Sequence, residues 1–168
     1  MDGVYAERPN FRDVAELHLD DVYAYLVYLT RDRSVAEDLT AETFERALRK
    51  WRRYDPGRAS ARTWLCQLAR SVALDHFRAE ERRRRREASF ASEEVAEEAF
   101  VEGLSPELER GLARLSAAER EVVVLRVVLE LDGETTARLL GISPSACSTR
   151  LSRALQRLEQ EVNADAVV

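Results

Sequence analysis

The sequence predicts an all-α protein: two small helical domains joined by an acidic flexible linker, with a helix-turn-helix in the second domain. Three observations support this fold class. Apolar residues recur at helical spacing through most of the chain, and no stretch alternates as a strand would. Helix-capping signals stand before the apolar stripes. Periodicity is lost between residues 88 and 104, where acidic and small residues dominate.

The first domain is predicted to span residues 11–87, after a loose leader at residues 1–10. Its first helix runs from about Phe11 to Leu29, with Leu17 in the apolar stripe. Its second helix begins at Ser34, which forms an S-x-x-E capping box with Glu37. The apolar face of this second helix is Val35, Leu39, Phe44, Ala47, Leu48 and Trp51.

A long third helix follows the break at Asp55-Pro56-Gly57, with Ser60 as its cap. Its apolar stripe is Trp64, Leu65, Leu68, Val72 and Phe77. Beyond that stripe the helix ends in five consecutive arginines, Arg82 to Arg86. This run is either a solvated surface, partly neutralised by neighbouring glutamates, or a surface for backbone phosphates.

Charge is strongly segregated, although the formal net charge is only −5. Residues 46–86 hold 14 basic and four acidic residues, a local charge of +10, whereas residues 88–111 hold seven glutamates and one arginine. Phosphate binding responds to the local field and not to the sum. The net charge therefore does not exclude a nucleic-acid partner.

The second domain is predicted to span residues 105–162, with a tail at 163–168. Ser105 before Pro106, and a capping box from Ser116 to Glu119, open its first two helices. A short helix at about 133–140, the turn Gly141-Ile142-Ser143 and a last helix from Pro144 to about Val162 form the helix-turn-helix.

The last helix has a buried face and a polar face. We expect Cys147, Leu151, Ala154, Leu155 and Leu158 to be buried. Small hydroxyl side chains then face outward near its N-terminal end and allow close approach to a duplex, while Arg150, Arg153 and Arg157 reach phosphates or guanine edges. A helical hairpin that does not touch DNA is the alternative interpretation.

Little in the sequence favours an enzyme. The two histidines, His18 and His76, have no cysteine or carboxylate partners at ligand spacing, and no glycine-rich phosphate loop or nucleophile elbow is present. Cys66 and Cys147 lie in helical patterns and are expected to be free, buried thiols. We expect no cofactor, no metal and no catalysis. Without a signal peptide or membrane-spanning run, the protein is predicted to be cytoplasmic.

Three blocks carry a resemblance to a known family. They are AEDLTAETFERAL (36–48), ARTWLCQLARSVALDHFR (61–78) and LSAAEREVVVLRVVLELDGETTARLLGISPSACSTRLSRALQRL (115–158). In this order, with an acidic linker between the second and third, they resemble the extracytoplasmic-function (ECF, group 4) sigma factors of the sigma-70 family, over about residues 11–162. The resemblance implies an alternative sigma factor that binds core RNA polymerase and reads the −10 and −35 promoter elements.

The resemblance also implies three sets of site residues. The polymerase-binding set is Asp38, Leu39, Glu42 and Phe44. The −10 set is Arg58, Ser60, Arg62, Arg70, Ser71, Asp75 and Arg78. The −35 set is Ser145, Ser148, Thr149, Arg150, Ser152 and Arg153. The implied partners are the β′ clamp and β subunits of core polymerase, promoter DNA and an anti-sigma factor, with no membrane insertion.

The chain departs from the usual family pattern at a few positions, which affect promoter sequence and not the class. Ala41 stands where glutamine is frequent, Ser71 where asparagine is usual, and Ser148 where lysine is frequent. The linker is either a nucleic-acid mimic that enters the polymerase or a solvated tether. The competing function is a free-standing helix-turn-helix regulator, which would not need the acidic block at 38–44.

Overall fold

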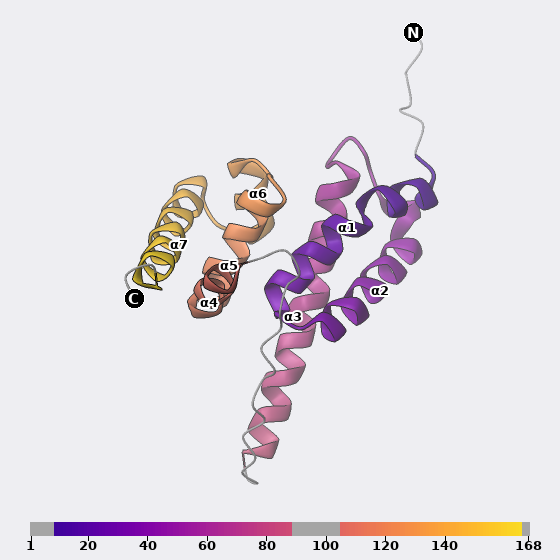
Figure 1. Cartoon of the computed structure of the whole chain (residues 1–168). Coiled ribbons are helices and arrows are strands. Elements are labelled where there is room, and N and C mark those ends of the chain that lie inside the picture. The colour runs from indigo at the N-terminus through magenta and orange to yellow at the C-terminus, as the bar shows by residue number, and fades with distance from the viewer. Residues whose placement is uncertain (1–8, 89–104, 166–168) are drawn as a thin grey trace. The chain divides into compact units, whose positions relative to one another are not determined.

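The protein is described by a computed structural model over residues 9–88 and 105–165. Within these ranges every regular element is a helix, which confirms the all-α prediction for this part of the chain (Figure 1). The chain forms two compact units, the first built mainly from α1 to α3 and the second mainly from α4 to α7. The predicted leader up to residue 8, the acidic linker from residue 89 and the last three residues lie outside the described residues.

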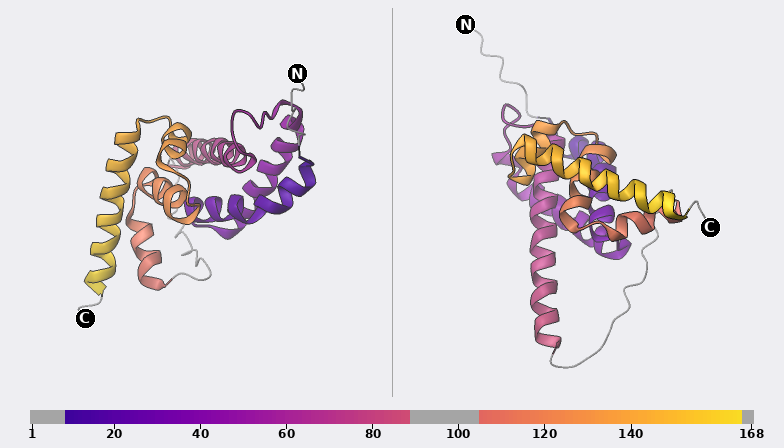
Figure 2. Two further views of the ribbon diagram at one scale, coloured as in Figure 1. Left: turned by 90° about the horizontal axis from the view of Figure 1, so that it is seen from above. Right: turned by 90° about the vertical axis from the view of Figure 1, so that its left-hand side faces the viewer.

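Three helices make the first unit: α1 (Phe11–Thr30), α2 (Arg33–Lys50) and α3 (Ala61–Glu87), with a single 3₁₀ turn, η1 (Trp51–Arg53), after α2. The core contribution of α3 comes only from its first half, through Leu65, Cys66, Leu68, Ala69, Val72 and Ala73. The C-terminal half of α3 extends beyond α1 and α2 (Figures 1 and 2). Ser60 caps α3 as predicted, since its side chain accepts a hydrogen bond from the backbone N–H of Thr63.

The predicted start of the second helix is wrong by two residues. Asp32, and not Ser34, is the cap of α2: its Oδ1 accepts from the backbone N–H of Val35 at 3.0 Å, and its carbonyl accepts from Ala36. Ser34 therefore lies inside the first helical turn. A carboxylate at the cap position is also favoured by the partial positive charge at the helix N-terminus.

Three leucines assigned to buried stripes are exposed. Leu17 is 73% exposed, Leu48 58% and Leu155 40%. At 100° per residue Leu17 lies about 140° around the helix from Val22, and Leu48 the same angle from Thr43, both of which are fully buried. Each helix buries a narrower stripe than its apolar residues mark out, so leucines at the stripe edge face solvent.

The second unit contains α4 (Pro106–Arg114), α5 (Ala117–Val123), η2 (Val124–Val128), α6 (Gly133–Leu140) and α7 (Pro144–Asp165). The caps at Ser105 and Ser116 are confirmed, the latter as a complete capping box with Glu119. One feature was not predicted: α5 runs into a π-helical turn, in which the N–H of Leu129 donates to the carbonyl of Val124 at 2.9 Å. The final helix ends at Asp165, a few residues beyond the predicted end.

The helix-turn-helix is formed by α6, Gly141 and α7. Asp132 caps α6, and Gly141 ends it in the left-handed conformation with φ of 66°. A side chain at this backbone conformation is strained, which explains the glycine. The hydroxyl of Ser143 then accepts from the N–H of Ala146 and opens α7. No helix in the described ranges is long and apolar enough to cross a membrane.

Candidate functional site

The acidic positions of the polymerase-binding set lie on the outer side of α2. Asp38 is exposed and Glu42 is half-exposed, and their i, i+4 spacing puts them on one face of the helix. Leu39 is only 5% exposed, so it packs in the core and holds α2 in position. Phe44 is half-buried. Within this predicted set the exposed groups are therefore the acid pair, and Phe44 lies about 160° around the helix from Glu42.

Glu42 also belongs to a chain of charges that links α2 to α3. Arg46 on α2 donates from Nη2 to Glu42 Oε1 at 2.5 Å and from Nη1 to Asp75 Oδ2 on α3 at 3.0 Å. Arg78 lies farther from the same aspartate, with 3.8 Å between its Nη1 and Asp75 Oδ1. The hydrogen bond to Asp75, together with Glu42, raises the pKa of Arg46, although partial burial opposes this.

The loop before α3 is a tight turn built on Asp55. Its Oδ1 accepts from the N–H of Gly57 at 2.9 Å, and its carbonyl accepts from the N–H of Arg58 at 3.1 Å. The Arg58 side chain is 89% exposed, with its Nε 3.6 Å from Asp55 Oδ2. The Ser60 hydroxyl is already engaged twice by Thr63, by its backbone N–H and its side chain, so its main role in the described structure is to cap α3.

A cluster of four aromatic rings supports this loop. Trp51 stacks on Tyr54 at 4.9 Å between ring centroids, and Trp64 lies 5.1 Å from Tyr54. Phe11 packs edge-on against Trp51 at 5.3 Å. Tyr54 is 3% exposed and its hydroxyl donates to the carbonyl of Ala59, which ties the cluster to the loop. This cluster was not predicted from the sequence, although the spacing of Trp51, Tyr54 and Trp64 around the Asp55 turn was a signal for it.

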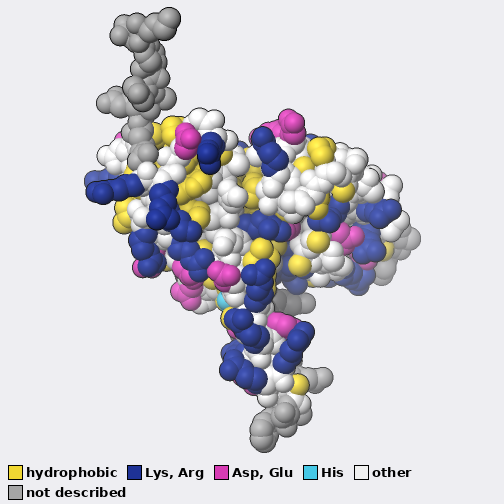
Figure 3. Space-filling view, turned by 180° about the vertical axis from the view of Figure 1, so that it is seen from behind, with side chains coloured by type: hydrophobic (Ala, Val, Ile, Leu, Met, Phe, Trp, Pro, Cys, Tyr) yellow, Lys and Arg dark blue, Asp and Glu magenta, His cyan; other side chains and the backbone are white. Residues whose placement is uncertain are grey.

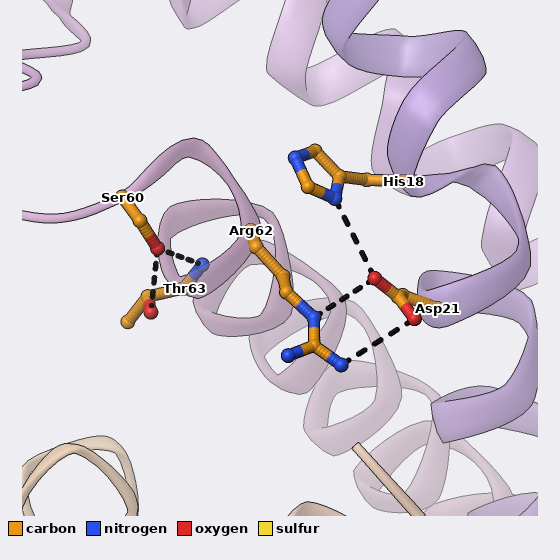
Figure 4. Close-up of polar contacts among 5 residues, drawn as sticks. All are labelled: His18, Asp21, Ser60, Arg62 and Thr63. Atoms are coloured by element: carbon orange, nitrogen blue, oxygen red, sulfur yellow. Dashed lines mark hydrogen bonds and ion pairs between the residues drawn. The ribbon is translucent and has the colours of Figure 1, made fainter. Parts of the chain in front are cut away.

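Arg62 from the −10 set is held by α1 (Figure 4). Its Nε donates to Asp21 Oδ2 at 2.8 Å and its Nη2 to Asp21 Oδ1 at 3.5 Å. His18 contacts the same carboxylate oxygen as Arg62 Nε, with its Nδ1 at 3.5 Å from Oδ2. His18 therefore does have a carboxylate neighbour, contrary to the sequence prediction, because a helical i, i+3 spacing joins it to Asp21.

The −10 set divides between two sides of α3. Ser71, Asp75 and Arg78 follow one another at spacings of four and three residues and share one exposed face. Arg62 lies about 140° around the helix from Asp75, on the side toward α1. Arg70 is half-buried between these two directions. The structure thus brings three of the predicted residues together and leaves Arg62 apart from them.

The exposed face of α7 carries the −35 set. Ser145, Ser148, Thr149, Ser152 and Arg153 are exposed, and Arg150 is half-exposed. A hollow of about 500 Å³ opens between the start of α5 and this face, lined by Ser116, Ala118, Glu119, Ser145, Ala146, Thr149, Arg150 and Arg153. Arg157 pairs with Glu119 at 3.3 Å. Five of the six predicted residues therefore share the exposed helix face, and half-exposed Arg150 lies at its margin, about 160° around the helix from Ser148.

The arginine run continues α3 as an exposed helix, and its positive charge is partly neutralised. Arg83 pairs with Glu80 at 3.0 Å and Arg85 with Glu81 at 2.9 Å. Figure 3 shows basic side chains with a few acidic ones on this projecting segment. Within the described ranges, no three histidine, cysteine, aspartate or glutamate side chains gather as metal ligands.

Comparison with known proteins gives consistent matches in both units. Residues 14–84 match the family described as Sigma-70 region 2, and residues 105–158 match Sigma-70, region 4. The chain is 32% identical over 168 residues to the ECF RNA polymerase sigma factor BldN of Streptomyces coelicolor, covering 95% of this chain but 63%, less than two thirds, of that protein. It is 32% identical over 148 residues to the ECF RNA polymerase sigma factor SigC of Mycobacterium tuberculosis, covering 86% of this chain and 79% of that protein.

A solved structure is also similar. It is the sigma factor RpoE from Bartonella quintana, in complex with the anti-sigma factor NepR. Its TM-score to this chain is 0.80 at 25% sequence identity, covering 92% of this chain and 98% of that chain.

Proposed function

The chain belongs to the ECF RNA polymerase sigma factors, which direct promoter-specific transcription initiation, and we propose that it does so through three surfaces on α2, α3 and α7. A sigma factor is a non-enzymatic subunit, so each surface binds and none catalyses. The first surface binds core polymerase, and the other two bind DNA.

The polymerase-binding surface is the acid pair Asp38 and Glu42 on α2. Two carboxylates on one exposed helix face favour a partner helix that carries basic side chains, such as a coiled coil of the β′ clamp. Phe44 lies about 160° around the helix from Glu42 and so outside this surface, whereas buried Leu39 supports the surface from the core.

The −10 surface is the face of α3 that carries Ser71, Asp75 and Arg78, with Arg58 in the preceding loop. Exposed arginines there contact backbone phosphates, and the small Ser71 leaves room for an unstacked base. Arg62 acts indirectly: bound to Asp21, it fixes the first turn of α3 and with it the loop. The aromatic cluster also supports this loop, through the hydrogen bond from the Tyr54 hydroxyl to the carbonyl of Ala59.

The −35 surface is the N-terminal half of α7. Its exposed hydroxyl side chains allow the helix to enter a major groove, where Arg150 and Arg153 can meet base edges or phosphates. This is the use of a second helix that helix-turn-helix proteins share. The hollow beside Ser116 provides space for a phosphate backbone next to the helix.

The observation that carries this proposal is the exposed pair of Asp38 and Glu42, in the same chain as the polar face of α7. A free-standing regulator, the second candidate, needs only α7. Transcription with core polymerase on fragmented DNA of the source genome, with the RNA 5′ ends sequenced, tests the function directly. We expect start sites that core polymerase alone does not use; their absence contradicts the proposal.

Charge reversal separates the two candidates. We expect D38R/E42R to weaken core polymerase binding at least tenfold, about 1.4 kcal/mol, while DNA binding by the second domain stays unchanged. The control is E16R/D20R, which reverses two exposed acids at the same i, i+4 spacing on α1. Equal polymerase binding by both double variants would show that the acid pair on α2 is not the polymerase-binding surface.

We further propose that a separate anti-sigma protein controls this chain in the cytoplasm. The support is the similarity to the Bartonella quintana sigma factor, whose structure was solved with its anti-sigma factor. Co-purification of the tagged chain with a protein that blocks its binding to core polymerase is the expected result. A chain that purifies from its source only with polymerase, under every growth condition, contradicts it.

A further inference from the structure

One arginine links the helix proposed to bind polymerase to the helix proposed to bind DNA. Arg46 contacts Glu42 on its own helix at 2.5 Å and Asp75 on α3 at 3.0 Å, using a different guanidinium nitrogen for each. Asp75 and Glu42 are separated by 33 positions in sequence and belong to different proposed surfaces. A single cation therefore serves both.

The exposure of these groups leaves them open to partners. The Arg46 side chain is 28% exposed, Glu42 43% and Asp75 50%. A basic group of polymerase can thus reach Glu42 without displacing the helix. A phosphate that approaches α3 meets Asp75 with Arg78 one turn away.

Asp75 poses an electrostatic problem on a DNA-binding face, because a carboxylate repels phosphates and lowers affinity. Arg46, on the neighbouring helix α2, neutralises the charge of this carboxylate. The planar fork of an arginine can hold two carboxylates at once, whereas a lysine ammonium is a point charge that cannot span both in this geometry. The degree to which the charge of Asp75 is neutralised therefore depends on how strongly Glu42 interacts with the same guanidinium.

We propose that Arg46 is the positioning residue that couples polymerase binding to −10 DNA binding. The inference rests on the proposed surfaces and adds the connection between them. When a cation of polymerase pairs with Glu42, Arg46 is left to neutralise Asp75 fully, and Arg78 is freed from that carboxylate for phosphate. Polymerase binding then strengthens DNA binding and, by thermodynamic reciprocity, DNA binding strengthens polymerase binding by the same factor.

The chain contains a matched control for this arginine. Arg49 pairs with Glu45 at 3.0 Å with the same i, i+4 spacing on α2. Among the described residues that carboxylate is the partner of its side chain, and no contact to α3 involves it. Replacing Arg49 by lysine thus makes the same chemical change on the same helix without touching the link to Asp75.

The test measures the dissociation constant of the full chain for core polymerase, with and without a saturating forked DNA that carries a promoter found by the transcription experiment. The ratio of the two constants is the coupling factor. We expect at least a fivefold ratio for the unmodified chain, within the usual range for coupled sites. R46K should lower this ratio at least threefold, whereas R49K should keep it within 1.5-fold.

A rescue experiment distinguishes positioning from general support of the fold. If Arg46 acts by neutralising Asp75, adding D75N to R46K removes the carboxylate that repels DNA, and tight binding of the forked DNA returns. A structural role of Arg46 predicts no such rescue. If R46K lowers the melting midpoint markedly, the D75N single variant provides the test instead. We expect D75N to bring the coupling factor close to one.

The outcomes are distinguishable. Three results would each overturn the inference. They are equal coupling factors for R46K and R49K, no recovery of DNA binding when D75N is added to R46K, and a D75N variant that keeps the coupling factor of the unmodified chain. An unmodified chain that starts transcription but has a coupling factor near one would also overturn it, and the proposed function would then stand. A chain that does not bind core polymerase would contradict both the proposed function and this inference.

Discussion

The Nε atom of Arg62 lies 2.8 Å from Oδ2 of Asp21, which joins the first turn of α3 to the middle of α1 across 41 residues of sequence. Both side chains are about one-third exposed. Ser60, two residues earlier, caps the same turn. An arginine that the family resemblance assigns to the −10 set is thus part of the frame that holds the loop before α3.

Replacing Asp21 should loosen this frame. We expect D21N to lower the free energy of unfolding by about 1 kcal/mol, because an Arg–carboxylate pair this exposed contributes little more than that. Urea unfolding followed by tryptophan fluorescence measures it, since Trp64 lies two residues from Arg62. The neighbouring D20N, at an exposed position, is the control, and equal effects of the two substitutions would contradict the assigned role.

The cap of α2 gives a second prediction. D32A should cost about 1 kcal/mol in the stability of the helix start, whereas S34A should be close to neutral, because Asp32 accepts the bond from the Val35 N–H. Amide hydrogen exchange at Val35 is the direct readout, with an expected acceleration of about fivefold in D32A. Faster exchange in S34A than in D32A would restore the capping box predicted from the sequence.

The helix-turn-helix should carry a pH dependence from Asp132. Hydrogen bonds from the Thr135 backbone and side chain lower the pKa of this carboxyl below its ordinary value of 3.8. The folded state is therefore favoured by the ionised form, and this stabilisation is present above pH 4 and is lost as the pH falls through the lowered pKa. The melting midpoint measured between pH 6 and pH 2 should fall less steeply in D132N than in the unmodified chain, with E159Q on α7 as the control. Identical pH profiles for all three proteins would contradict the role of Asp132.

Cys66 should be chemically inert in the folded protein. Burial raises the pKa of its thiol to about 12, and the side chain is fully buried. In a C147A background at pH 8, we expect a thiol reagent to label Cys66 at least a hundredfold more slowly in buffer than in urea, because little thiolate forms. Comparable labelling rates in the two conditions would show that the core of α3 opens readily.

Local signals in the sequence predicted much of the secondary structure. Ser60, Ser105 and Ser116 cap their helices as expected, and Gly141 makes the predicted turn. These features depend on residues within about four positions of one another, so the local sequence is enough to predict their geometry. The misassigned cap at Ser34 fails for the same local reason: two acceptors compete within one turn, and Asp32 is better placed.

Burial was predicted less well than helix position. Leu17, Leu48 and Leu155 fit an apolar stripe by spacing and are exposed, because a helix buries only the side that its neighbours cover. The π-helical turn at Val124–Val128 also escaped the sequence patterns. No residue type in this segment signals a π-helical turn by its spacing.

The sequence by itself determined that this chain is helical, where most helices begin and end, and that its blocks are those of an ECF sigma factor. Tertiary structure alone decided which charged side chains meet: Asp21 with Arg62, and Asp75 with Arg46. The reason is physical. Helix formation follows from neighbours along the chain, whereas an ion pair between helices depends on how each helix is rotated against its neighbour, which only the packed core sets.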